Sequence, residues 1–276
     1  MPRSCINNVN IYYEVKGQGE PLLLIHGLAS SSRSWEKQVS VFTQNYRVIT
    51  FDIRGHGRSD KPIGPYSIEL FAADAVELMR FLGIDSAHVI GFSMGGMVGF
   101  QLAVDVPEMV KSLVAVNCCP EGSMRTLDYG IDCFKHLVLR QFNGRRKRGQ
   151  DTGGQLVQAS MLGNPHESVI ERLAVNNKLA YASAFRSLVA WSVVDRLHTI
   201  ICPILLVTSD RDYVPVSVKQ GYASKMTSVE LAVIDNSSHA IPTERAEEFN
   251  ALVMEFLSRS RHWAVTQLAN ERKIRQ

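Results

Sequence analysis

The sequence predicts an α/β fold: a mainly parallel β-sheet with helices on both faces. Six continuous apolar runs of strand length predict strands that are buried on both sides. Helical patterns lie between these runs, and strands that alternate with helices favour parallel pairing. The runs are PLLLIHG (21–27), YRVITFD (46–52), AHVIGF (87–92), KSLVAVN (111–117), CPILLVT (202–208) and VELAVID (229–235).

A further strand is predicted near the N-terminus. The segment NVNIYYEVKG (8–17) places Val9, Ile11 and Tyr13 on one face, and this alternation is typical of a half-buried strand. We expect it to be an antiparallel strand at the edge of the sheet.

Two of the helical patterns have clear ends. A helix over residues 68–83 has Ser67 as its N-cap and stops at Gly83, while a second helix begins directly after Ser93 and ends before Pro107. The residues that we expect to share one face of the first helix are Leu70, Ala73, Val76, Leu78 and Phe81.

The alternation of strands and helices is interrupted once. Roughly 85 residues separate the strand that ends at Asn117 from the strand at 204–208, far more than one crossover helix needs. We therefore predict a helical cap over residues 119–190, inserted between the two parts of a core domain formed by residues 1–118 and 191–276. Within this region, apolar residues recur every three or four positions at Leu127, Ile131, Phe134, Val138 and Phe142, which predicts a helix. The segments 165–180 and 183–197 also have helical patterns.

Composition and charge limit the classes of function. The chain is 45% apolar and 21% charged, as globular proteins are, and its net charge of +3 is too small to indicate a nucleic-acid or membrane partner. Because no apolar run has the length of a signal peptide or a membrane span, we expect a cytoplasmic protein. The five cysteines have irregular spacing and no H-E-x-x-H motif occurs, so we expect reduced thiols, no metal and no other cofactor.

A serine lies at the junction of a predicted strand and a predicted helix. The segment GFSMGG fits the motif G-x-S-x-G around Ser93 and has the strand–turn–helix context that this motif requires. Gly91 and Gly95 remove side chains where helix and strand pack closely, so that Ser93 can take a strained backbone and expose its hydroxyl. Ser93 is therefore the candidate nucleophile, and it needs a base and a carboxylate that orients the base.

The expected partners follow Ser93 in the order acid, then histidine. Asp210 and Asp212 both follow the strand at 203–208, and their positions leave either one as the acid. His239 lies in a loop after the last predicted strand and is the candidate base. His262 lies in a charged stretch, and we expect it on the surface.

Taken together, these segments resemble the α/β-hydrolase superfamily over nearly the whole chain, and within it the small serine esterases and enol-lactonases. The resemblance implies an eight-stranded sheet with an inserted helical cap. It favours Asp212 over Asp210 as the acid, and it implies that the backbone N–H groups of Leu28 and Met94 form an oxyanion hole. The matching segments are LLLIHGL (22–28), FDIRGHGRSD (51–60), GFSMGGM (91–97), TSDRDYVP (208–215) and SSHAIPTE (237–244).

Other features of the resemblance narrow the choice. Arg54 and His56 lie in the segment 52–60, which is a structural turn in this superfamily. Some members carry the acid after the strand that ends here at Asn117, and the asparagine excludes that arrangement. A serine nucleophile also argues against the dehalogenase and epoxide-hydrolase branches, which use an aspartate.

The leading hypothesis is a serine hydrolase that cleaves a small carboxylic ester or lactone through an acyl-enzyme on Ser93, with His239 as base and Asp212 as the orienting acid. The same triad would also serve a carbon–carbon bond (diketone) hydrolase or a thioesterase. A third hypothesis, from another class, is a ligand-binding receptor without catalysis.

The remaining expectations concern the substrate and the partners. Phe134, Met161 and Trp191 are candidates for lining an apolar substrate pocket under the cap. The basic stretch Arg145–Arg148 is interpreted as a solvated loop, with a rim that attracts an anionic substrate as the alternative. We expect a small-molecule partner and a monomer or homodimer, in which Trp263, Val265 and Leu268 of the C-terminal tail would form the contact.

Overall fold

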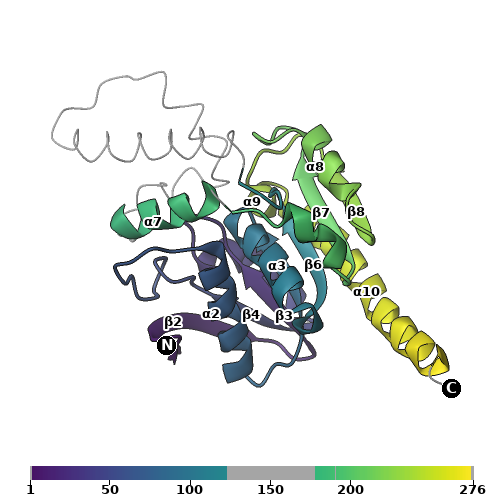
Figure 1. Cartoon of the computed structure of the whole chain (residues 1–276), viewed down its shortest axis with the longest axis horizontal. Coiled ribbons are helices and arrows are strands. Elements are labelled where there is room, and N and C mark those ends of the chain that lie inside the picture. Colours follow the sequence, from purple (N-terminus) through teal and green to yellow (C-terminus); the bar gives the residue numbers. More distant parts are fainter. Residues whose placement is uncertain (1, 123–177, 190, 275–276) are drawn as a thin grey trace.

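An eight-stranded sheet forms the centre of the protein (Figure 1), of which a computed structural model describes residues 2–122, 178–189 and 191–274, with side chains as far as Ser260. The strand order is β1-β2-β4-β3-β5-β6-β7-β8. All neighbours from β4 to β8 pair in parallel, whereas β1 and β2 pair antiparallel. This confirms the predicted fold class. The strands are β1 (Arg3–Ile6), β2 (Val9–Lys16), β3 (Glu20–Ile25), β4 (Tyr46–Phe51), β5 (Ala87–Phe92), β6 (Val110–Val116), β7 (Ile204–Ser209) and β8 (Val229–Ile234).

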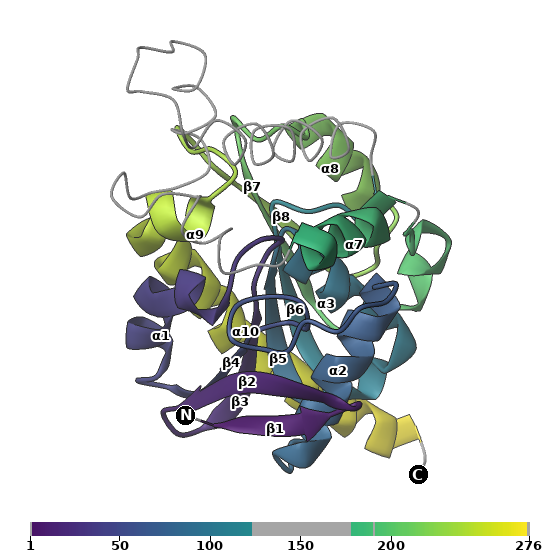
Figure 2. The ribbon, with the colours of Figure 1, turned by 90° about the vertical axis from the view of Figure 1, so that its left-hand side faces the viewer.

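Helices cover both faces of the sheet. Helices α2 and α3 pack on one face and α1 lies on the other, together with α10 (Figure 2). Successive side chains of β3 serve the two cores in turn: Leu23 and Ile25 join the first, Leu22 and Leu24 the second. The helices are α1 (Glu36–Phe42), α2 (Ile68–Phe81), α3 (Met94–Asp105), α7 (Lys178–Val189), α8 (Val216–Ala223), α9 (Ile241–Glu244) and α10 (Ala246–Ile274).

The N-terminal hairpin corrects one prediction. Strand β2 was expected at the edge of the sheet, but it lies between β4 and the short strand β1, which is the true edge. Asn7 and Asn8 both have positive φ angles, 47° and 62°, as a two-residue hairpin turn of type I′ requires. Strand β1 escapes prediction because only Ile6 of its four residues is buried.

Helix α2 begins as predicted and buries part of the predicted face. The Ser67 side chain accepts a hydrogen bond from the Leu70 N–H (3.0 Å) and caps the helix. Of the residues predicted to share the inner face, Leu78 is buried and Leu70 and Val76 pack against the core, whereas Phe81 is 54% exposed. Apolar residues occur on two sides of this helix, so periodicity alone does not choose the side that the sheet covers. The buried apolar residues are Ile68, Phe71, Ala72, Ala75, Leu78 and Met79.

The long insertion leaves and re-enters the core at one place. The Gly122 N–H donates to the Trp191 carbonyl (2.8 Å), and the Val193 N–H donates to the Pro120 carbonyl (2.9 Å). The spaced apolar residues 127–142, the stretch Arg145–Arg148 and most of the segment 165–180 lie outside the described residues, so the cap and its boundaries stay a prediction. The helix expected over 183–197 is interrupted, because α7 ends at Val189 and a 3₁₀ helix follows at Val194–Thr199.

Helix α10 contains the C-terminal tail and extends past the sheet (Figure 1). Its backbone stays helical to Ile274. The side chains of His262, Trp263, Val265 and Leu268 lie outside the described part of the chain, so the dimer contact and the surface position of His262 stay predictions.

Candidate active site

Ser93 lies in a sharp turn between β5 and α3. Its φ and ψ angles of 54° and −120° are rare for a residue other than glycine, and the conformation is strained. The Ser93 N–H donates to the Val116 carbonyl (2.9 Å), and the Ser93 carbonyl accepts from the Gly96 N–H (2.8 Å). The neighbouring strand and the first turn of α3 therefore hold the strained residue in place.

Two glycines allow this turn to form, as the motif predicts. A Cβ atom at Gly91 would lie 2.1 Å from the Gly95 carbonyl oxygen. A Cβ atom at Gly95 would lie 2.1 Å from the Ile25 carbonyl oxygen, so α3 starts directly against the end of β3. Side chains at either position would separate the helix from the sheet.

The structure brings Ser93, His239 and Asp212 together at the carboxyl ends of the strands. His239 Nδ1 lies 2.8 Å from Asp212 Oδ1, and His239 Nε2 lies 3.1 Å from Ser93 Oγ. A carboxylate only accepts hydrogen bonds, so Nδ1 carries the ring proton and Nε2 accepts from the Ser93 hydroxyl. Burial alone would raise the pKa of Asp212, but the hydrogen bond and charge of His239, together with Lys219, lower it below the usual value.

The geometry separates the two aspartates that the sequence left open. Asp210 accepts the Ser237 N–H (3.1 Å) and pairs with Arg211 (3.6 Å) at the surface, whereas Asp212 contacts His239. Only Asp212 is therefore placed to orient the histidine.

Tyr213 is a neighbour of His239 that sequence reasoning missed. Its hydroxyl lies 3.0 Å from His239 Nε2, the same nitrogen that faces Ser93. The two rings lie with their centroids 4.4 Å apart. Since Nε2 has one lone pair, the hydroxyls of Tyr213 and Ser93 compete for it. The position directly after the candidate acid is the signal that would have pointed to Tyr213.

The sequence analysis also did not identify Lys219 and Asn117 as neighbours of the Asp212–His239 pair. Lys219, on α8, donates to Asp212 Oδ2 and to Asn117 Oδ1 (3.1 Å). The Asn117 amide group, at the end of β6, donates to the His239 carbonyl oxygen (2.8 Å). Asn117 is therefore a neutral side chain that ties the His239 loop to the sheet.

The predicted oxyanion residues lie next to one another in the fold. Met94 is the first residue of α3, so its N–H has no partner inside the helix. Leu28 lies in a turn that the Ser30 N–H closes onto the Gly27 carbonyl (3.3 Å). Gly95 packs against the strand end that leads into this turn, which places the two segments side by side. Their role stays a prediction.

A second acid–histidine pair lies at the ends of β3 and β4. The carboxylate of Asp52 accepts the N–H groups of Ser32 and Arg58, each at 2.7 Å. His26 Nδ1 donates to the Gly27 carbonyl (2.8 Å), and His26 Nε2 accepts the Ile53 N–H (3.0 Å). Burial lowers the pKa of His26, although the nearby Asp52 raises it. Both hydrogen bonds of His26 therefore end on the backbone, while Asp52 also lies 3.6 Å from the Arg58 guanidinium group.

The turn at residues 52–60 is tied to α2 by a buried ion pair. Arg54 contacts both carboxylate oxygens of Asp74, at 2.5 and 2.6 Å. His56 is buried and donates from Nδ1 to the Arg54 carbonyl (3.1 Å). Burial, with a contribution from His26, lowers the pKa of His56 to about 3, so the ring is neutral. These contacts agree with the structural role that the resemblance implies.

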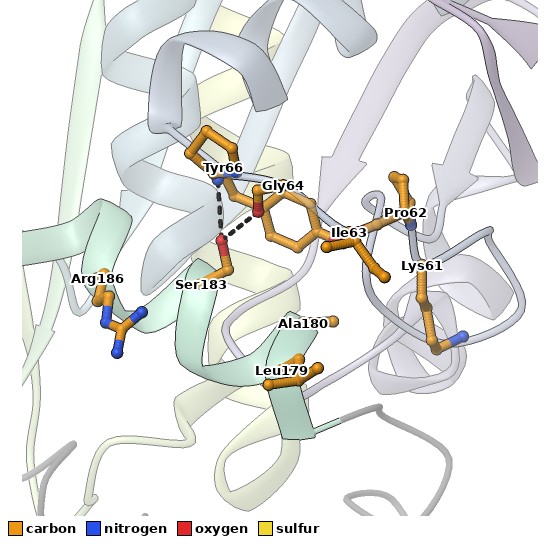
Figure 3. Close-up of a pocket in the computed structure, with 10 residues that line it drawn as sticks. Lys61, Pro62, Ile63, Gly64, Tyr66, Leu179, Ala180, Ser183 and Arg186 are labelled. Carbon is orange, nitrogen blue, oxygen red and sulfur yellow. Dashed lines mark hydrogen bonds between the residues drawn. The ribbon is translucent and has the colours of Figure 1, made fainter.

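A cavity of about 390 Å³ lies between the loop Lys61–Tyr66 and α7 (Figure 3). The Ser183 hydroxyl joins its walls, because it donates to the Gly64 carbonyl and accepts the Tyr66 N–H, both at 2.9 Å. Neither Ser93, Asp212, His239 nor Trp191 lines this cavity.

The predicted pocket residues are only partly described. Trp191 is buried, and its indole N–H donates to the Gln101 side chain (2.6 Å). Phe134 and Met161 lie outside the described residues. The pocket role of all three stays a prediction.

The described residues contain neither a metal-ligand cluster nor a helix that could span a membrane. In the described ranges, no three His, Cys, Asp or Glu side chains gather in a way that would hold a metal ion. No helix among the residues that the structure describes has both the length and the apolar character of a membrane span. Cys5, Cys118, Cys119 and Cys202 are free thiols.

Comparisons with known proteins agree with this architecture. Residues 20–246 match the family model described as alpha/beta hydrolase fold. A protein of Stutzerimonas stutzeri named "Putative carbamate hydrolase RutD" is 31% identical, over 90% of this chain and 97% of its own length. The enol-lactonase of Burkholderia xenovorans superposes with a TM-score of 0.75 at 22% identity, over 93% of this chain and all of its own. An enzyme that degrades N-acyl homoserine lactones has a TM-score of 0.74 at 28% identity, over 92% of this chain and all of its own. The chain therefore belongs to the alpha/beta hydrolase fold family of hydrolase enzymes, as its motifs predicted.

Proposed function

We propose that the chain is a serine hydrolase that cleaves a small carboxylic ester or lactone through an acyl-enzyme. One observation carries the proposal: the continuous hydrogen-bonded series Ser93 Oγ–His239 Nε2 and His239 Nδ1–Asp212 Oδ1, at 3.1 and 2.8 Å. This arrangement pairs a hydroxyl nucleophile with a base and the base with an orienting carboxylate.

The reaction would proceed in two acyl transfers. Ser93 Oγ attacks the substrate carbonyl carbon while His239 Nε2 takes the hydroxyl proton. The negative oxygen that forms accepts hydrogen bonds from the N–H groups of Leu28 and Met94. The protonated His239 then donates its proton to the departing alkoxide, which in a lactone stays attached to the acyl chain. A water molecule, deprotonated by His239, attacks the ester on Ser93 and releases the acid.

The choice of bond rests on the similar proteins. Two similar structures bear the names of lactone-cleaving enzymes, and the sequence relative bears the name of a carbamate hydrolase. Esters, lactones and carbamates all present a carbonyl carbon with a heteroatom leaving group, so one triad serves all three. One similar structure is a meta-cleavage product hydrolase, and the same triad would serve the diketone and thioester alternatives, so a substrate panel decides between the bonds.

The first test is labelling with a fluorophosphonate, followed by location of the adduct by mass spectrometry. We expect a single adduct on Ser93 and none in Ser93→Ala. Ser40→Ala is the matched control, because Ser40 is an exposed serine on α1, and this variant should label like the wild type. Folded wild-type protein that gives no adduct would contradict the proposal and favour the receptor alternative.

A substrate panel then tests the bond. It should contain short-chain esters, lactones, a carbamate, a thioester and a vinylogous diketone, each assayed with wild type and Ser93→Ala. We expect ester or lactone turnover to exceed the others and to disappear in Ser93→Ala. Turnover of the diketone without ester turnover would instead identify a carbon–carbon bond hydrolase.

A further inference from the structure

Lys219 is a buried lysine next to the proposed acid. Only 2% of its surface is exposed. Lysine is almost never fully buried unless it is paired, so this position indicates a buried partner. It lies on the inner face of α8, and its helical neighbours Tyr222 and Ala223 pack against the core. A lysine at such a position needs a partner that compensates for its desolvation.

Its partners use the full donor capacity of the ammonium group. Nζ donates to Thr208 Oγ1 (2.5 Å), to Asn117 Oδ1 (3.1 Å) and to Asp212 Oδ2. These acceptors come from β7, from the end of β6 and from the loop after β7. The core itself therefore fixes the ammonium group at this point.

The carboxylate of Asp212 is divided between two partners. Oδ2 accepts from Lys219, while Oδ1 faces His239 and also accepts the Tyr213 N–H (3.0 Å). A single negative charge thus lies between the ammonium group of Lys219 and a histidine that becomes a cation when it takes a proton. Like charges close together disfavour one another, so the ammonium group opposes protonation of the histidine.

We propose that Lys219 is a positioning residue of this site: it holds Asp212 as an anion in one orientation and opposes protonation of His239. The inference rests on the proposed function, because it acts through the same acid–histidine pair.

Other titratable groups lie near this acid–histidine pair. Burial raises the pKa of Cys119 to about 12 and also raises that of Cys118, so both thiols are neutral. Glu121 is engaged by the Tyr222 hydroxyl. His239 also contacts the Phe92 ring and the hydroxyls of Ser93 and Tyr213, and the Glu244 carboxylate on α9 accepts the N–H and the hydroxyl of the adjacent Ser238.

The test is the pH dependence of the fluorophosphonate labelling rate, which needs no knowledge of the natural substrate. In Lys219→Met we expect the midpoint of the acidic limb to move up by about one pH unit, because the charge that opposes histidine protonation is gone. Lys219→Arg keeps the charge and should restore the wild-type midpoint. Lys225→Met is the matched control, since Lys225 is an exposed lysine just after α8 and its loss changes the net charge equally.

The outcomes separate this inference from the proposed function. A wild type that labels on Ser93, with the same acidic midpoint in Lys219→Met but a lower rate at every pH, would mean that Lys219 is only structural. A wild type that does not label at any pH would overturn the proposed function and this inference with it. If Lys219→Met does not fold, Lys219→Gln keeps an N–H donor without the charge, and the same shift of the midpoint decides.

Discussion

The protein contains two buried aspartates that each lie near a histidine and a cation, and the two groups differ in where their hydrogen bonds end. Asp52, at the end of β4, lies near His26 and Arg58; Asp212, after β7, lies near His239. Both carboxylates are almost fully buried and both have a lowered pKa. Residue types alone therefore do not distinguish them.

The difference lies in the second nitrogen of each histidine. Both ring nitrogens of His26 bond to the backbone: Nδ1 to the Gly27 carbonyl and Nε2 to the Ile53 N–H. In His239, Nδ1 bonds to Asp212, whereas Nε2 faces side-chain hydroxyls. A histidine whose bonds all end on the backbone stabilises a turn, whereas one with a nitrogen directed at a hydroxyl can move a proton.

The largest expected effect comes from the same substitution in both histidines. His239→Asn removes the proposed base and should lower the labelling rate of Ser93 by about 10⁵- to 10⁶-fold. His26→Asn keeps a donor for the Gly27 carbonyl, so labelling per folded molecule should stay within about tenfold. It should lower the free energy of unfolding by about 1–3 kcal/mol, because the Ile53 N–H loses its acceptor. Equal losses of labelling in the two variants would break the comparison.

The next effect comes from the two aspartates. Asp212→Asn should lower the labelling rate by about 10⁴-fold, because an amide group no longer holds His239 in the tautomer that accepts from Ser93. Asp52→Asn should label at the wild-type rate per folded molecule. Labelling kinetics on both variants, corrected by circular dichroism for the folded fraction, provide the check.

The pH dependence of stability sharpens the comparison for Asp52. Burial raises the pKa of Asp52, but the charge of His26 and the N–H groups of Arg58 and Ser32 lower it by more than burial raises it. The folded pKa therefore lies below the unfolded value of 3.8. Asp52 therefore stabilises the fold above about pH 4, and this contribution disappears as the pH falls through the folded pKa. Asp52→Asn should lower the free energy of unfolding at pH 7 by about 1–3 kcal/mol. In urea unfolding between pH 7 and 2, the deficit should shrink below pH 4; a constant deficit would contradict this account.

The smallest expected effect concerns Tyr213. Tyr213→Phe removes the hydroxyl that competes with Ser93 for His239 Nε2, and we expect labelling to accelerate by less than about tenfold. A slower reaction would instead assign the Tyr213 hydroxyl a supporting role in proton transfer. Tyr222→Phe, on the nearby helix α8, is the control for loss of a tyrosine hydroxyl away from His239.

The sequence predicted the elements that carry strong local signals. Strands β3 to β8 are continuous apolar runs, and Ser93 lies between glycines at a strand–helix junction, so periodicity and motif suffice. Periodicity could not identify which of Asp210 and Asp212 is the acid, because the two residues share one loop. Only the path of the chain in three dimensions decides which one reaches His239.

Lys219 could not be predicted for a different reason. A lysine in a helix is normally assigned to the solvent side, and nothing local shows that an acid lies opposite it. The prediction for the inner face of α2 failed in part, because Phe81 is apolar but stays 54% exposed beside Tyr13 of β2. The Lys219–Asp212 contact depends on the path of the chain between β7 and α8, and the burial of α2 depends on how the helix packs on the sheet.

The strained backbone of Ser93 has a consequence for evolution and engineering. A positive φ suits glycine, and holding a serine there costs on the order of 1 kcal/mol. Ser93→Gly would relieve that strain and abolish the proposed chemistry in one step. Selection of this protein for heat tolerance alone would therefore favour loss of the nucleophile, and any programme of thermostabilisation must screen for turnover at the same time.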